Sequence, residues 1–159
     1  MSTAANYAKL EFPSLSENVA FARSAAAVFA SRLDFTLDEI DEIKVAASEA
    51  VSNAVVHAYR GGAPGPVRMT LEVRDGALVI TVEDDGCGIE DVEWAKEAAH
   101  TTDPEERMGL GLVFISEYMN EVDLTSTVGR GTRLRMVKRP ARAGGAALGG
   151  PRGRGVLRR

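Results

Sequence analysis

Glu49 and Asn53, a carboxylate and an amide four residues apart, form one pattern that could do chemistry. Residues at this spacing share one face of a helix, and the neighbouring residues are mostly small and apolar. Mg²⁺ keeps several waters and needs few protein oxygens, so the Asn53 carbonyl and ligand phosphates would suffice to hold it. Glu49 could orient or accept a proton. The same spacing also fits an ordinary solvated pair on a surface helix.

A second pattern is the run Asp-Asp-Gly-Cys-Gly from Asp84 to Gly88. It follows an expected strand, and Gly86 and Gly88 would let a flat ligand approach the main chain. The Asp84 carboxylate could accept a hydrogen bond from an exocyclic amine. Because Asp and Gly are common in turns, the run also fits a turn with an acidic tip.

Gly109 and Gly111 flank a leucine at an expected helix start, where free N–H groups and the helix dipole suit a phosphate. A single Gly-x-Gly also fits helix entry without a ligand. The glycines at 61–65 lack the Lys-Ser/Thr ending of a phosphate-binding P-loop. Two histidines and one cysteine give no zinc spacing, and the Gly-x-Ser-x-Gly of serine hydrolases is absent.

The elements that position these residues follow from periodicity and caps. Residues 9–12 predict a short strand, and residues 16–33 predict an Ala-rich helix with Ser16 as N-cap. Thr36 and Glu39 form a capping-box pattern before a second helix that reaches about residue 59. Glu49 and Asn53 therefore lie on this second helix.

The clearest strand signal is an alternation of apolar and polar residues over 67–73 and again over 78–82. Asp75-Gly76 between them favours a two-residue hairpin turn. Such a turn aligns the apolar residues on one buried face. The predicted pairs are Val73 with Leu78, Leu71 with Ile80 and Met69 with Val82.

The remaining chain completes the predicted fold. Residues 89–108 have weak periodicity and predict a long loop that acts as a lid, followed by a third helix over 112–120. Two final strands are expected at 122–126 and 133–137. This order predicts a two-layer α/β (α+β) sandwich, with three helices covering one face of a mostly antiparallel mixed sheet.

Composition indicates one soluble domain. The chain has 159 residues, of which 45% are hydrophobic and 26% charged. A single cysteine and the lack of a long apolar run or signal peptide favour a cytoplasmic protein without a membrane segment. We expect the domain to span residues 1–138. Residues 139–159, rich in Gly, Ala and Arg, are expected to be a disordered tail, and an acidic body argues against direct nucleic-acid binding by the domain.

Taken in order, the patterns resemble the four boxes of the GHKL (Bergerat-fold) ATPases, with Gly131-Thr132 as the fourth. Residues 1–138 look like the bacterial anti-sigma serine kinases of this superfamily. They are most similar to the sporulation anti-sigma-F factors. The stretches that carry this likeness are Ser48–Ala54, Phe21–Arg23 and Thr101–Gly111.

The resemblance implies a protein serine/threonine kinase that uses ATP and Mg²⁺ to phosphorylate, and so inactivate, an anti-anti-sigma partner. It also implies inhibitory binding of an RNA polymerase sigma factor, sporulation sigma-F, by a homodimer. The implied catalytic residues are Glu49, as general base, and Arg107, near the γ-phosphate. The implied nucleotide-binding residues are Asn53 (also the Mg²⁺ ligand), Asp84 (for the adenine amine), Gly86, Gly88, Thr101, Thr102, Gly109, Gly111 and Thr132. Arg23 is the implied partner contact.

Three alternatives stay open at this point. The chain could serve a general-stress (sigma-B type) system, act as a histidine-kinase-like ATP-binding module, or bind ATP as a switch without transferring phosphate. Two departures from the family pattern accompany them. The lid is about one residue shorter than in the family pattern, which bears on the role of Arg107. The basic tail beyond Arg139 has no counterpart in that pattern.

Overall fold

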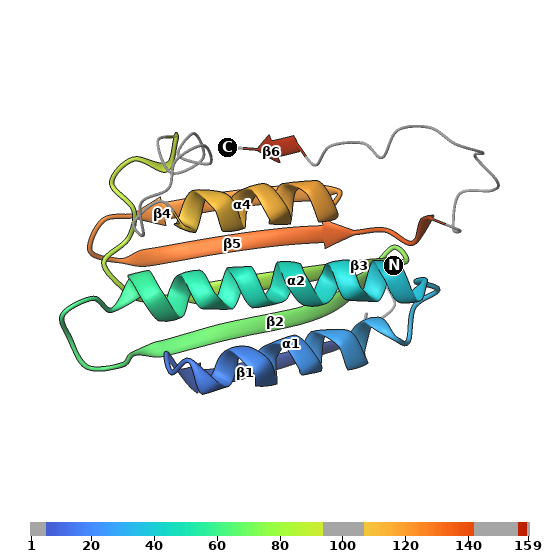
Figure 1. The fold of residues 1–159 in the computed structure, drawn as a ribbon, viewed down its shortest axis with the longest axis horizontal. Coiled ribbons are helices and arrows are strands. Elements are labelled where there is room, and N and C mark those ends of the chain that lie inside the picture. The colour runs from blue at the N-terminus through green and yellow to red at the C-terminus, as the bar shows by residue number, and fades with distance from the viewer. Residues whose placement is uncertain (1–5, 94–106, 142–155, 159) are drawn as a thin grey trace.

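A six-stranded sheet in the order β1-β2-β3-β5-β4-β6 carries its helices on one face in the computed structural model (Figure 1). The structure describes residues 6–93, 107–141 and 156–158. The strands are β1 (Tyr7–Pro13), β2 (Pro66–Arg74), β3 (Ala77–Asp84), β4 (Glu121–Thr127), β5 (Gly131–Lys138) and β6 (Val156–Arg158). Neighbouring strands are antiparallel except β4 and β6, which are parallel. The predicted two-layer α/β class with a mostly antiparallel mixed sheet is confirmed.

Among the described residues, the helical layer comprises α1 (Glu17–Ala30), α2 (Leu37–Asn53) with its π-helical continuation η1 (Ala54–Ala58), and α4 (Arg107–Tyr118). Thr36 and Glu39 form the predicted capping box at the start of α2. The Glu39 N–H donates to Thr36 Oγ1 at 3.2 Å, and the Thr36 N–H donates to the Glu39 carboxylate at 2.8 Å. Ser16 occupies the N-cap of α1, but its side chain makes no capping hydrogen bond.

The hairpin of β2 and β3 has the predicted register, with Val73 opposite Leu78, Leu71 opposite Ile80 and Met69 opposite Val82. All but the partly buried Val73 belong to the buried core beneath the helices. The period-2 alternation therefore fixed which face of the hairpin the helices cover, because a slip of one residue would have exposed this entire set.

The start of α4 differs from the prediction. The helix begins at Arg107 rather than at residue 112, so Gly109 and Gly111 lie inside its first turns instead of before it. In an α-helix the first N–H groups have no partner within the helix, while later ones bond to the carbonyl four residues before. The Gly109 N–H is therefore still placed to meet an anion, whereas that of Gly111 is engaged within the helix.

Three residues of the C-terminal segment add a strand to the sheet. Val156–Arg158 forms β6, which pairs with β4 in the register Glu121–Val156. β4 would otherwise present a row of unpaired backbone groups to solvent, and a Val-Leu pair suits an added strand. Closer to β5, the Arg139 N–H donates to Asn120 at 2.7 Å.

Part of the predicted lid and its site residues, Thr101 and Thr102, lie outside the described residues. Within the described part of the chain, every helix falls short of the length and apolarity that spanning a bilayer requires.

Candidate functional site

A cleft opens where the end of α2 and η1 meets the ends of β3 and β5. Its walls are mostly apolar with a few polar groups, the usual character of a small-molecule site. It is lined by Ala50, Asn53, Ala54, His57, Ala58, Val82, Asp84, Gly88, Ile89, Leu112, Leu124, Thr132 and Leu134. The fold thus brings together four of the residues singled out from the sequence, Asn53, Asp84, Gly88 and Thr132, from separate parts of the chain.

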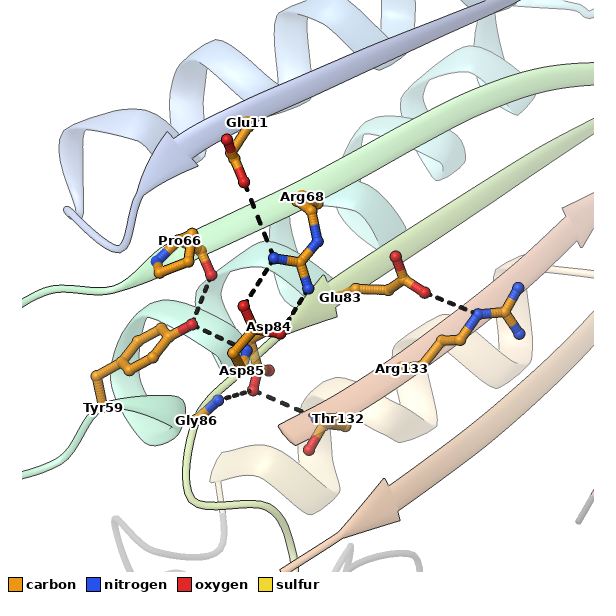
Figure 2. Close-up of polar contacts among 10 residues, drawn as sticks. All are labelled: Glu11, Tyr59, Pro66, Arg68, Glu83, Asp84, Asp85, Gly86, Thr132 and Arg133. Carbon is orange, nitrogen blue, oxygen red and sulfur yellow. Dashed lines mark hydrogen bonds and ion pairs between the residues drawn. The ribbon is translucent and has the colours of Figure 1, made fainter. Parts of the chain in front are cut away.

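Asp84, the last residue of β3, is buried in this cleft with 8% of its surface exposed. Its Oδ1 accepts hydrogen bonds from the Gly86 N–H at 2.9 Å and the Thr132 N–H at 3.3 Å (Figure 2). Both bonds end on Oδ1, which leaves Oδ2 available to a donor in the cleft. Burial raises the pKa of Asp84, and the two N–H donors oppose that rise by stabilising the carboxylate. The arrangement presents a fixed acceptor suited to an amine.

The glycines of the Asp84–Gly88 turn are required by close packing of the turn against two neighbours. A Cβ atom on Gly86 would lie 2.1 Å from the Ala58 carbonyl oxygen, and one on Gly88 would lie 2.5 Å from the Thr127 carbonyl oxygen. Gly88 also has a φ of 74°, in the left-handed region that favours glycine. Glycine here lets the main chain pass between η1 and the end of β4 and form one wall of the cleft.

Glu49 and Asn53 meet α4 at Gly111. A Cβ atom on Gly111 would lie 2.7 Å from Glu49 Oε2 and 3.6 Å from Asn53 Oδ1, so both side chains reach the same point on α4. Burial raises the pKa of the Glu49 carboxyl, which brings it nearer to the range useful for a proton acceptor. Asn53 lines the cleft, while Glu49 lies one helical turn before it on α2.

Other predicted residues lie apart from this cluster. Arg23 is exposed on α1, an element that contributes no lining residue among those described. Arg107 is the first residue of α4, and Gly109 follows in its first turn.

Two residues that sequence reasoning missed, Tyr59 and Arg68, secure the turn at Asp85. The Tyr59 hydroxyl accepts from the Asp85 N–H at 2.9 Å, and the Asp85 carboxylate receives two hydrogen bonds from Arg68 at 2.8 and 2.7 Å (Figure 2). The Arg68 guanidinium lowers the pKa of Asp85. The predicted hairpin register contained a signal for this ion pair, because it places Arg68 opposite Glu83, on the face to which Asp85 belongs. His57 is buried and also lines the cleft.

Comparisons with known proteins agree with this geometry. Residues 12–138 match the family described as histidine kinase-like ATPase domain. A solved histidine kinase domain, from the blue-light activated histidine kinase EL346 of Erythrobacter litoralis, has a similar fold with a TM-score of 0.50 and 25% identity. The match covers 80% of this chain and 61% of that structure, which is less than two thirds of its length. Fold and cleft therefore define a histidine kinase-like ATPase domain.

Curated relatives show to which group within this family the chain belongs. The chain is 46% identical to the anti-sigma F factor of Pasteuria penetrans over 136 residues, which cover 84% of this chain and 91% of the relative. It is 41% identical to the anti-sigma F factor of Geobacillus kaustophilus and 40% identical to that of Bacillus subtilis, with 95% and 92% of those proteins covered. The chain therefore belongs to the anti-sigma F factors within the histidine kinase-like ATPase family.

Proposed function

We propose that this chain binds ATP with Mg²⁺, transfers the γ-phosphoryl group to a serine of an anti-anti-sigma protein, and sequesters a sigma factor of the sigma-F type as a homodimer. The observation that carries the proposal is the meeting of Glu49 and Asn53 at Gly111, beside a cleft that ends in the fixed Asp84 carboxylate. A binder without transfer activity would have no use for a half-buried carboxylate beside the phosphate end of such a cleft.

The residues fit the nucleotide. Asp84 Oδ2 would accept the adenine amine, and apolar side chains such as Val82 and Leu134 would contact the ring. The free N–H groups at the start of α4, including Gly109, suit phosphate oxygens, and by resemblance Thr101, Thr102 and Arg107 would complete that end. Among the described residues, no group of three or more His, Cys, Asp or Glu side chains is arranged to hold a metal ion. Mg²⁺ would therefore depend on Asn53, phosphate oxygens and water.

The chain's own residues would position the reactants and accept one proton. As the serine Oγ bonds to the γ-phosphorus and the bond to the β-phosphate oxygen breaks, ADP leaves and Glu49 takes the serine proton. Mg²⁺ would neutralise charge that develops on the phosphate oxygens. Positioning and electrostatic stabilisation account for most of the rate in such transfers, so Asn53 and the α4 N-terminus matter by holding the phosphates and Glu49 by its place beside them.

The test uses the purified chain, MgCl₂, γ-labelled ATP and anti-anti-sigma proteins from the same genome. We expect label on a serine of one partner. Glu49→Gln should bind ATP as the wild type does and lose at least about a hundredfold in transfer rate. Asp41→Asn, an exposed carboxylate change on the same helix, is the control. Label on a histidine, or binding without transfer by the wild type, would overturn the serine kinase assignment.

The sigma-binding half of the proposal is tested separately. Arg23 is exposed on α1, outside the cleft, so Arg23→Ala should weaken co-elution with a sigma-F type factor without changing the dissociation constant for ATP. Co-elution with a sigma-B type factor alone would reassign the partner, and unchanged sigma-F binding by the variant would remove Arg23 from the interface.

A further inference from the structure

We propose that Tyr59 is a positioning residue that sets the cleft's preference for a base bearing an exocyclic amine, an inference that rests on the proposed nucleotide-binding function. Tyr59 follows η1 directly and lies outside the residues that line the cleft. It would act through the Asp84–Gly88 turn rather than by touching the base.

The Tyr59 hydroxyl bridges two segments of main chain. It donates to the Pro66 carbonyl at the start of β2, at 2.6 Å, and accepts from the Asp85 N–H at 2.9 Å (Figure 2). The ring has room because position 65 is glycine, where a Cβ atom would lie 2.2 Å from the Tyr59 ring. One hydroxyl thus joins the first residue of the β2–β3 hairpin to the turn that follows the hairpin.

Residues next to Tyr59 hold the following part of the same turn. The Ala58 carbonyl accepts from the Cys87 N–H at 2.7 Å, and the His57 carbonyl accepts from the Cys87 thiol at 3.3 Å. These carbonyls belong to the last residues of the helix, which lack partners within it. Three consecutive residues, 57–59, therefore bind the turn, with Tyr59 the one that does so through its side chain.

Arg68 holds the turn from the opposite side. Its guanidinium makes two hydrogen bonds to the Asp85 carboxylate and lies 3.9 Å from Glu11 on β1 (Figure 2). Asp85 is thus fixed at its main chain by Tyr59 and at its side chain by Arg68. Gly86 directly follows Asp85, and its N–H donates to Asp84 Oδ1. By fixing Asp85, these two contacts hold that donor in place and so keep the Asp84 carboxylate aligned.

This linkage predicts an effect on selectivity rather than on binding in general. A site built to hydrogen-bond a particular group discriminates strongly against an analogue that lacks it, provided that the acceptor stays aligned. Tyr59→Phe keeps the ring against Gly65 but removes both hydroxyl bonds. The Asp84 carboxylate should then lose alignment, while the apolar walls that contact any purine ring are unchanged.

The experiment compares dissociation constants for ATP and for purine riboside 5′-triphosphate, which lacks the 6-amine, with MgCl₂ in both titrations. The wild type should prefer ATP. Tyr59→Phe should lose about tenfold in affinity for ATP, a change of about 1.4 kcal/mol, and less than about twofold for the analogue. Tyr118→Phe is the matched control, because that ring stacks on Phe114 within α4 and its loss of a hydroxyl should leave both constants unchanged.

A structural defect would weaken both ligands equally and lower the melting temperature, and that result would overturn the proposal, as would an unchanged preference for ATP. If Tyr59→Phe fails to fold, Arg68→Gln decides, since it should reduce the same preference through Asp85. Failure of the proposed function is distinguishable, because the wild type itself would then show no preference for ATP over the analogue.

Discussion

Gly111 on α4 faces the Glu49 carboxylate on α2 so closely that a Cβ atom there would lie 2.7 Å from Glu49 Oε2. The glycine is therefore required less for backbone freedom than for clearance. Two helices far apart in the sequence meet at the residue proposed to accept a proton, and the smallest side chain stands at the contact.

Gly111→Ala should separate folding from activity. Alanine is favoured over glycine in a helix by about 1 kcal/mol, so the melting temperature should change little even after Glu49 yields to the new methyl group. Displacement of about 1 Å in a catalytic group can cost about a hundredfold in rate, so single-turnover transfer to the serine partner should fall at least tenfold. Gly62→Ala is the control, because the nearest atom to its Cβ lies 3.9 Å away. Transfer by Gly111→Ala at the wild-type rate would refute the clearance argument.

The buried state of Glu49 predicts a pH dependence of stability. Burial raises its pKa in the folded chain, so from about pH 4.3, the ordinary pKa of glutamate, up to the raised value, the unfolded state binds fewer protons. The free energy of unfolding contributed by this group therefore falls as pH rises through that window. Glu49→Gln does not titrate. In urea denaturation, its stability relative to wild type should increase as pH rises above about 4.3, and the difference should close at lower pH. Parallel stability curves for the two proteins would contradict the assignment.

The sequence predicted the parts of this site that depend on interactions between residues close together in the chain. Asp84 was placed at the end of a strand because alternation and the Asp75-Gly76 turn are local signals, and the observed register agrees. Asn53 was placed beside Glu49 by helix periodicity alone. The family's ordered motifs then indicated which of these local features would meet in one site.

The unpredicted parts depend on tertiary contacts. The start of α4 at Arg107 was missed because Gly109 and Gly111 have poor helix propensity, which packing against α2 outweighs. Tyr59 was treated as a helix end, since nothing in its local sequence reveals that Asp85 and Pro66 would flank its hydroxyl. Similarly, the short β6 exists through the edge of β4 rather than through any strong strand signal of its own.

Gly88 and Gly129 offer a matched test of crowding at the turn. Their φ angles are 74° and 77°, so alanine at either position meets the same backbone penalty of about 1 kcal/mol. A Cβ atom on Gly129 meets nothing within 4 Å, whereas one on Gly88 would lie 2.5 Å from the Thr127 carbonyl oxygen. Gly88→Ala should thus cost about 1–3 kcal/mol more in free energy of unfolding than Gly129→Ala, and should also weaken ATP binding. Equal costs in urea titrations would show that the turn moves freely away from β4.

Thr36 and Ser16 allow a final comparison between two N-caps of the same chain. Thr36 accepts a hydrogen bond from the Glu39 N–H, whereas Ser16 makes no side-chain capping bond. Thr36→Ala should therefore lower the free energy of unfolding by about 1 kcal/mol, and Ser16→Ala should lower it much less. Because Thr36 lies at the end of α2 opposite Asn53, the dissociation constant for ATP should be unchanged under conditions where both variants are folded. A weakened ATP affinity for Thr36→Ala alone would instead show that strain at the start of α2 reaches Glu49 and Asn53 along the helix.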